Sequence, residues 1–374
     1  MTGFICIVTE TLPAGLLPQI SDDMGISPSM AGQTVTAYAF GSFLTAIPLT
    51  IATRAWRRRS VLLLAIIGFL VFNSATALSS DYHLTMTARF LAGVSAGLAW
   101  SLLAGYARRM VEPHQQGKAM AVAMVGTPLA LSLGVPLGTW LGTAIGWRAT
   151  FGIASAMTLA LVPWVLAKVP DFPGQAARER MPLRRVFTTP GVRPVLAVVL
   201  TWMLAHNLLY TYIAPFATHA NLGASVDLLL LTFGVAALAG ISIAGKLVDG
   251  FLRRTVLASL AAFAAAALAF GLAAHWPAAV YAGTALWGMT FGGAATLLQT
   301  ALADAAGDGA DVAQSMNVVV WNLAIAGGGL TGGALLDIWG AGAFPWAVQS
   351  LLAAALIIAW SARAHAFRPG RRGA

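Results

Sequence analysis

The chain has 374 residues, of which 58% are hydrophobic and only 9% are charged, with a formal net charge of +9. Soluble domains carry about 25% charged residues, so this composition excludes a water-soluble fold and predicts an all-α integral membrane protein without a large soluble domain. Cys6 is the single cysteine, which excludes an intrachain disulfide and argues against a thiolate metal site.

Apolar stretches of about 20 residues, long enough to cross a bilayer, recur along the whole chain. We predict twelve transmembrane helices, over residues 3–20, 30–52, 60–78, 84–107, 119–143, 149–167, 191–216, 225–246, 255–274, 277–303, 313–335 and 343–363. The first starts almost at Met1 with no basic residue before it, and Glu10 interrupts its apolar run. These features argue against a signal peptide and predict a true span, with the completeness of the N-terminus left open.

The basic residues mark one side of the membrane. All of the 22 lysines and arginines except Arg89 and Arg148 lie in every second connection or in the C-terminal tail. The opposite connections carry the acids Asp22, Asp23, Asp81, Asp227 and Asp337. Because basic loops stay in the cytoplasm, both termini are predicted to be cytoplasmic. The positive charge is therefore a topology signal, and nucleic-acid binding is not expected.

The longest connection, between residues 168 and 190, is polar, basic and rich in proline. It predicts a six-helix half at residues 1–168, a cytoplasmic linker at 169–190, a second six-helix half at 191–363 and a cytoplasmic tail at 364–374. The halves echo each other, because LTIATRAWRRR joins spans two and three and GKLVDGFLRR joins spans eight and nine. Such a repeat predicts a binding site between the halves near the bilayer midplane, with one half rocking against the other.

Several segments resemble the major facilitator superfamily, whose loop signature is G-x-L-x-D-R-x-G-R-R. The second half matches it at Gly245, Leu247, Asp249, Arg253 and Arg254, and departs from it at Gly250 and Leu252. In the first half Arg54, Arg57 and Arg58 fit the same frame, but Leu49, Thr53 and Trp56 replace its glycines and its aspartate. The resemblance therefore implies a cytoplasmic latch that is altered in the first half.

Two helix motifs extend the resemblance. Arg89-x3-Gly93-x3-Gly97 is similar to the fourth-helix motif of the family, and a segment centred on Gly134, Pro136 and Gly138 resembles the fifth-helix motif of drug:proton antiporters. The starts of the two halves, ETLPAGLLPQI and HNLLYTYIAPF, are similar to the bacterial efflux branch with arabinose, sugar and chloramphenicol exporters. The resemblance implies twelve helices in two pseudo-symmetric halves, in the bacterial inner membrane, acting as a monomer without a cofactor by proton-coupled antiport.

Arg89 places a full charge inside a predicted span, at a cost of about 3 kcal/mol or more, so it requires a partner or a water-filled surrounding. At a rise of 1.5 Å per residue, Glu10 lies about 12 Å from Pro18 and Arg89 about 9 Å from His83, which puts both charges at similar depth. We expect them to pair, and Glu10 to exchange protons as its access to water changes. The alternative is that Glu10 is simply wet at a frayed helix start and Arg89 is a strut bonded to carbonyls.

Two further sets of residues predict moving parts. Gly134, Gly138, Gly142 and Gly146 recur every four residues and form a smooth groove, which is kinked by Pro136 because a proline has no N–H to donate. This groove suits a sliding contact between the halves, or else ordinary tight packing. Gly245, Asp249, Arg253 and Arg254 form either a cytoplasmic charge latch, as the resemblance implies, or a solvated loop worth about 0–1 kcal/mol.

Aligning Pro18 with Pro215 places Asn207 opposite Glu10, so the second half offers polar and aromatic groups where the first offers an acid. The candidates for solute contact are Gln33, Tyr38, His206, Asn207, Tyr210, Gln299, Asn317, Trp321 and Asn322. For each of them the alternative is a helix–helix hydrogen bond, worth about 0.6 kcal/mol on average. His206 is a candidate for titration near neutral pH or else a packing histidine.

Together these features predict a proton-coupled secondary transporter that exports a small organic solute, drug-like or sugar-like, by alternating access. The chain contains no G-x-x-x-x-G-K-[ST] phosphate loop, so ATP is not expected to drive it. Neither a metal-ligand cluster nor a nucleophile–base–acid set points to an enzyme. The alternatives are a sugar or nucleoside exporter, a proton symporter for metabolite uptake, and a membrane sensor that binds without transporting. The expected partners are the solute, protons and the lipid bilayer.

Overall fold

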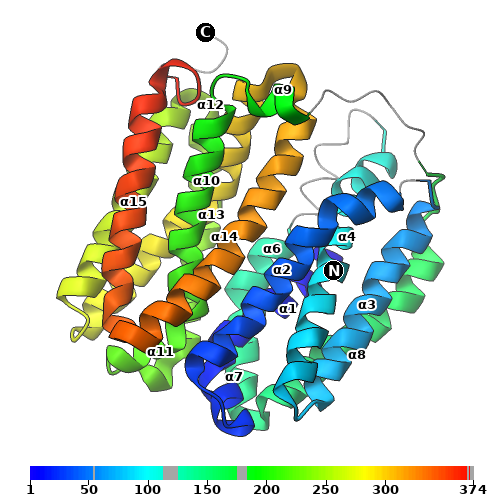
Figure 1. Ribbon diagram of the computed structural model, residues 1–374, viewed down its shortest axis with the longest axis horizontal. Coiled ribbons are helices and arrows are strands. Elements are labelled where there is room, and N and C mark those ends of the chain that lie inside the picture. The colour runs from blue at the N-terminus through cyan, green and yellow to red at the C-terminus, as the bar shows by residue number, and fades with distance from the viewer. Residues whose placement is uncertain (54, 113–124, 175–182, 369, 371–374) are drawn as a thin grey trace. The chain divides into compact units, whose positions relative to one another are not determined.

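The computed structural model describes residues 1–53, 55–112, 125–174, 183–368 and 370, and all regular secondary structure in these residues is helical (Figure 1). This confirms the predicted all-α fold. The chain divides into two compact units, Met1–Arg178 and Glu179–Ala374.

Unit 1 contains helices from the start of the chain to the end of the sixth predicted span. They are α1 (Thr2–Met24), α2 (Pro28–Ala52), α3 (Arg58–Leu78), α4 (Tyr82–Arg109), α6 (Gly126–Leu129), a π-helical turn (Ala130–Gly134), α7 (Val135–Ile145) and α8 (Trp147–Lys168). α2 packs against α4, α3 lies against α4 and α8, and α1 contacts α2 and α7. The start of the fifth predicted span falls on residues outside the described ranges.

Local sequence signals explain where these helices begin and end. Ser27 caps α2 by accepting a hydrogen bond from the N–H of Met30 at 3.2 Å, and Asp81 caps α4 by accepting one from Leu84 at 2.7 Å. α1 ends at Gly25, whose backbone is left-handed with φ of 63°, a conformation that glycine adopts readily. The π-helical turn ends two residues before Pro136, which has no N–H for the regular helical hydrogen bond.

Helix α3 is apolar both on the face that packs inside unit 1 and on the face that points outward. Val61, Ala65 and Phe69 are buried against α4 and α8, whereas Leu64 and Val71 are about half exposed, at 49% and 51%. An apolar side chain that points outward has little reason to be there in water but is stable against lipid. The buried and outward faces of α3 are therefore both apolar, as in a transmembrane helix.

Unit 2 is built from long helices joined by short helical turns. Its helices are α9 (Leu183–Phe187), α10 (Val192–Thr211), α11 (Ile213–His219), α12 (Val226–Leu272), α13 (Pro277–Ala306), α14 (Ala310–Trp339) and α15 (Phe344–Ser361), with short 3-10 turns at Gly223–Ser225, Gly307–Gly309, Ala341–Ala343 and Ala362–Ala364. α12 packs against α13, and α10 packs against α14 and α15. A Cβ atom on Gly240 would lie 1.9 Å from the carbonyl oxygen of Met289, so glycine is required where α12 and α13 meet.

The helix boundaries of unit 2 differ from the prediction in one place. The predicted spans 225–246 and 255–274 lie on either side of a kink in α12 at Phe251, where the backbone leaves the helical region with φ of −141° and ψ of 31°. The predicted span 191–216 is interrupted at Tyr212, between α10 and α11. In the described ranges, nine helical segments are long and apolar enough to cross a membrane, and one of these, Gly223–Leu272, includes both spans of α12. α2 and α13 have 25 and 30 residues but are not among the nine, so twelve spans remain a prediction.

Candidate functional site

Arg89 lies in the interior of unit 1, with none of its surface exposed. Its Nε donates a hydrogen bond to the carbonyl of Thr34 on α2 at 3.2 Å, and its Nη2 donates to the main-chain carbonyl of Glu10 on α1 at 3.5 Å. The guanidinium also lies over the rings of Tyr38 and Phe151, 4.9 and 5.5 Å from their centroids. Its Nη1 is buried without a hydrogen-bond partner among the described residues. The charge is therefore stabilised by carbonyl dipoles and aromatic faces.

The place of Tyr38 under this arginine is set by close contact between α2 and α4. A Cβ on Gly93 would lie 1.9 Å from the carbonyl oxygen of Tyr38, so a larger residue would push the two helices apart. The hydroxyl of Tyr38 donates to the carbonyl of Cys6 on α1 at 2.9 Å. Tyr38 thus links α1, α2 and α4 beside Arg89.

Glu10 is also buried, with 8% of its surface exposed. The carboxylate forms no hydrogen bond or ion pair with residues in the described ranges, although the charge of Arg89 acts on it. One residue earlier, Thr9 accepts a hydrogen bond from the amide of Asn73 on α3 at 2.9 Å. Asn73 was not among the predicted site residues, although a polar residue inside an apolar span is a signal that the sequence offers. An acid and a base therefore share the interior of unit 1, but the base is bonded to the main chain of Glu10 rather than to its carboxylate.

His206 stands at the centre of an aromatic cluster in unit 2. The indole N–H of Trp287 on α13 donates to its Nδ1 at 3.1 Å. The ring of Phe291 stacks on the imidazole with centroids 3.7 Å apart, and Tyr210 and Phe233 lie 5.2 and 5.6 Å away. Since an indole nitrogen can only donate, Nδ1 acts as the acceptor and a neutral His206 carries its proton on Nε2. Trp287 therefore fixes both the orientation and the tautomer of the histidine.

The other residues predicted to contact solute are more scattered. Asn207 and Asn322 donate to carbonyls of their own helices, those of Met203 at 2.7 Å and Val318 at 2.9 Å. Gln33 likewise donates to the carbonyl of Ser29 at 3.4 Å. Gln299 is exposed, Trp321 is half-buried, and the buried Asn317 has a side-chain oxygen without a partner in the described ranges. Among the candidates in unit 2, ring contact joins only His206 and Tyr210 within the described residues.

Comparison with known families decides what kind of protein this is. The model of the Major Facilitator Superfamily matches residues 1–249. The chain belongs to this superfamily. It is a multi-pass membrane transporter and not an enzyme.

Relatives and solved structures agree with this assignment. The chain is 30% identical over 339 residues to a purine ribonucleoside efflux pump, NepI, of Escherichia coli O6:H1, covering 88% of this chain and 84% of the pump. It is 29% identical over 335 residues to the NepI pump of Shigella sonnei, with the same coverage. In fold it is similar to the inward open xylose transporter XylE from E. coli, with a TM-score of 0.78 at 14% identity over 99% of this chain and 95% of that one.

The fifth-helix motif of this superfamily member packs tightly within its own unit. A Cβ on Gly134 would lie 2.7 Å from Val8, and one on Gly138 would lie 2.5 Å from Leu12. The glycine face is therefore occupied by α1, which corresponds to the tight-packing alternative. A gating role for Gly134, Pro136 and Gly138 stays a prediction.

The superfamily loop signature of unit 2 lies beside the end of α15. Arg253 donates hydrogen bonds of 2.9 Å to the carbonyls of Ala359, Trp360 and Phe367. Arg254 lies over the ring of Phe251, 5.7 Å from its centroid. Asp249 is exposed, and Gly245 faces open space. Arg253 thus ties the α12 kink to the last helix of its own unit, whatever part these four residues play in a latch.

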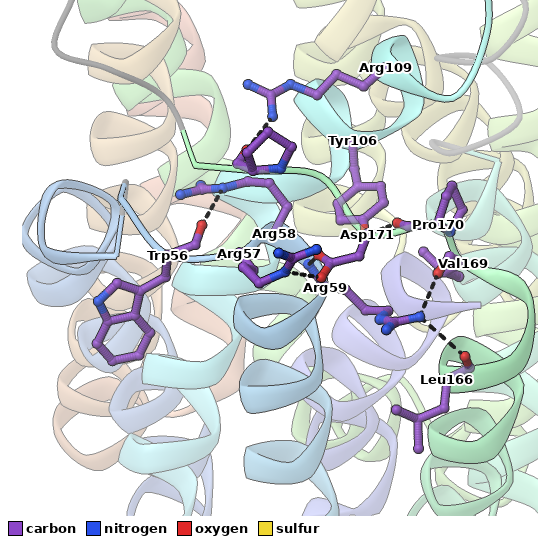
Figure 2. A network of polar contacts seen from close by, with 11 residues as sticks. Trp56, Arg57, Arg58, Arg59, Tyr106, Arg109, Leu166, Val169, Pro170 and Asp171 are labelled. Carbon is purple, nitrogen blue, oxygen red and sulfur yellow. Dashed lines mark hydrogen bonds and ion pairs between the residues drawn. The ribbon is translucent and has the colours of Figure 1, made fainter.

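The altered loop of unit 1 is organised by Asp171, which the sequence analysis missed (Figure 2). The carboxylate of Asp171 pairs with Arg57 and accepts a hydrogen bond from the backbone N–H of Arg59 at 3.2 Å. The hydrogen bond from Arg57 holds the pKa of this carboxyl below its usual value. Arg58 donates to the carbonyl of Thr53 at 2.6 Å. An acid in a proline-rich segment directly after the sixth span was the available signal.

Proposed function

We propose that the chain exports a purine ribonucleoside, or a solute of closely similar chemistry, in exchange for protons across the bacterial inner membrane. The observation that carries the proposal is the 30% identity to purine ribonucleoside efflux pumps over 88% of the chain. This favours the nucleoside alternative over the drug-like or sugar-like solute that the sequence predicts. The proposed topology keeps the twelve predicted spans, with both termini in the cytoplasm.

The interior of unit 1 supports proton coupling. An ionised carboxylate at membrane depth is costly, and the neighbouring charge of Arg89 lowers that cost for Glu10. Protonation of Glu10 removes this attraction and leaves Arg89 as an excess positive charge. The arginine is then more stable where water or another negative group can reach it, so the two protonation states of Glu10 favour different conformations of unit 1. Because Arg89 is bonded to carbonyls on α1 and α2, a change in its surroundings acts on both helices.

The cluster in unit 2 supports solute recognition. Purine rings stack on aromatic side chains and accept hydrogen bonds at their ring nitrogens. Phe291 is half-buried and stacks on His206, whose Nε2–H is directed away from the bond with Trp287. His206, Tyr210 and Trp287 are buried, and Phe291 is the partly exposed ring of the cluster. An aromatic ring beside a donor of fixed position suits a flat, nitrogen-rich solute better than a saturated sugar.

The test is transport by the purified chain in proteoliposomes. With an imposed pH gradient, labelled inosine should accumulate against its concentration gradient, and its movement should drive protons the opposite way. Xylose and a cationic drug serve as comparison solutes and should not be accumulated. Proton flux in the same direction as inosine would contradict antiport, and accumulation of a comparison solute in place of inosine would contradict the proposed substrate class.

A further inference from the structure

The two units differ at the junction where the loop signature meets the end of a unit's last long helix. In unit 1, the segment after α8 supplies Asp171, whose carboxylate lies against Arg57 and the start of α3 (Figure 2). In the signature frame, Arg57 and Arg58 correspond to Arg253 and Arg254 of unit 2. Among the described residues after α15, 362–368 and 370, there is no aspartate or glutamate. A carboxylate therefore lies at the first junction, and the described residues of the corresponding segment supply none at the second.

A cavity lies at the second junction instead. Its volume is about 310 Å³, and Phe251, Arg253, Arg254, Leu257 and Trp360 are among the residues that line it. The kink of α12 at Phe251 contributes to this opening, because the chain departs there from helical backbone angles. The cavity has room for a small charged group, with two arginines and two aromatic rings in its wall.

The charges around this cavity are mostly positive. Arg253 is engaged by the carbonyls at the end of α15. Arg254 is exposed and forms no hydrogen bond with residues in the described ranges; its guanidinium lies over Phe251. Arg363 lies close enough for its charge to act on Arg253. Asp249 is exposed and does not line the cavity. An anion in the cavity would reduce this repulsion, as Asp171 does in unit 1.

We propose that this cavity binds the phosphodiester headgroup of an anionic phospholipid. Arg254 would hold the phosphate through its planar fork of N–H groups, and Arg253 would add positive charge. Trp360 and Phe251 are 67% and 43% exposed, and tryptophan is enriched where a helix meets the lipid headgroups. A basic pocket between transmembrane helices at the end with the basic loops has the chemistry that binds anionic headgroups. The exposed aromatic rings favour a lipid over free phosphate.

The experiment titrates the purified full-length chain in detergent with phosphatidylglycerol, phosphatidylcholine or inorganic phosphate. Bound lipid is counted by native mass spectrometry, and the unfolding temperature is measured in parallel. We expect phosphatidylglycerol alone to bind and to raise the unfolding temperature. Arg254→Gln should weaken this binding about tenfold, because it loses hydrogen bonds to a charged group. Leu257→Phe narrows the cavity without changing its charge and should weaken binding as well.

Lys246→Gln is the matched control, since Lys246 is an exposed cation of the same helix, α12, that does not line the cavity. At about 1 M salt, where charges more than about 3 Å apart are screened, this variant should bind like the wild type while Arg254→Gln stays weaker. Equal affinity of wild type and Arg254→Gln, or equal losses in both charge variants, would overturn the site. If inorganic phosphate raised the unfolding temperature by the same amount, the occupant would not be a lipid. If phosphatidylcholine did so, the cavity would not select anionic headgroups.

Discussion

The interiors of the two units solve the problem of buried polar groups in different ways. Unit 1 keeps a full positive charge, Arg89, and stabilises it with main-chain carbonyls and aromatic faces. Unit 2 keeps a histidine, His206, in its interior and stabilises it with one indole donor and stacked rings. A cation needs several dipoles because the cost of burying charge is large, whereas a neutral imidazole needs only partners for its two nitrogens. The charged interior suits coupling to protons, and the aromatic interior suits contact with a solute.

The largest expected effect comes from removing the charge of unit 1. Arg89→Ala leaves the carboxylate of Glu10 without its nearby positive charge and two carbonyls without their donor, so we expect the free energy of unfolding to fall by about 3–5 kcal/mol and transport to be lost. Thermal unfolding in detergent and uptake by proteoliposomes measure these effects. Arg193→Ala, which removes an exposed arginine, should change neither. Full activity of Arg89→Ala would show that the buried cation has no part in transport.

Glu10→Gln separates coupling from binding. The amide is nearly the same size but cannot exchange a proton, so accumulation of inosine against its gradient should fall to background while downhill exchange continues. Both are measured in proteoliposomes with and without a pH gradient. Asp22→Asn, an exposed substitution on the same helix, should keep uphill transport. If Glu10→Gln retains the pH dependence of the wild type, the acid belongs to the structure of unit 1 and not to the coupling.

Trp287→Phe tests unit 2 with a smaller change. It keeps a buried ring but removes the donor to Nδ1 of His206, which costs about 1–3 kcal/mol for the unsatisfied nitrogen and frees the imidazole to change tautomer. We expect the KM for inosine to rise while coupling to protons is unchanged. Trp339→Phe, at an exposed position, is the control. A variant that loses coupling but keeps its KM would reverse the roles assigned to the two interiors.

Asp171→Asn should have the smallest effect on stability, because the ion pair that it removes lies outside the buried interiors of the two units. Because the Arg57 hydrogen bond lowers the pKa of Asp171 below 3.8, the folded state gains stability above about pH 4 and loses that gain as the pH falls through the lowered value. The wild type should therefore lose more unfolding temperature between pH 6 and pH 3 than Asp171→Asn does. Asp337→Asn, which is exposed, should behave like the wild type. A steeper acid loss in Asp171→Asn would contradict the pairing.

The positions of the long helices follow well from local sequence, and their packing partners do not. The apolar runs, the caps at Ser27 and Asp81 and the glycine at the end of α1 are all readable from neighbouring residues. The two spans within α12 also follow from the sequence, and the backbone leaves the helical angles between them at Phe251. The packing of α12 against α13 is a contact between residues far apart in the chain, so no local pattern predicts it.

The candidate sites divide in the same way. Arg89 and Glu10 are conspicuous in sequence because charge is rare in apolar spans, and their similar depth follows from helix rise alone. That the guanidinium bonds to the main chain of Glu10 rather than its carboxylate depends on how α1, α2 and α4 pack. Trp287 lies 81 residues from the histidine that it orients, and Asp171 lies 114 residues from Arg57. Such partners are chosen by the meeting of helices in space.

Composition and charge distribution by themselves established a helical membrane protein, because the cost of exposing apolar surface to water, or of burying charge in lipid, acts on each segment separately. The loop and helix motifs carried the family resemblance. The partner of each buried polar group was set by folding, since a hydrogen bond requires two atoms within about 3 Å of each other whatever their separation along the chain. That is why the arginine and the histidine could be found in the sequence, and why the carbonyls and the indole that hold them could not.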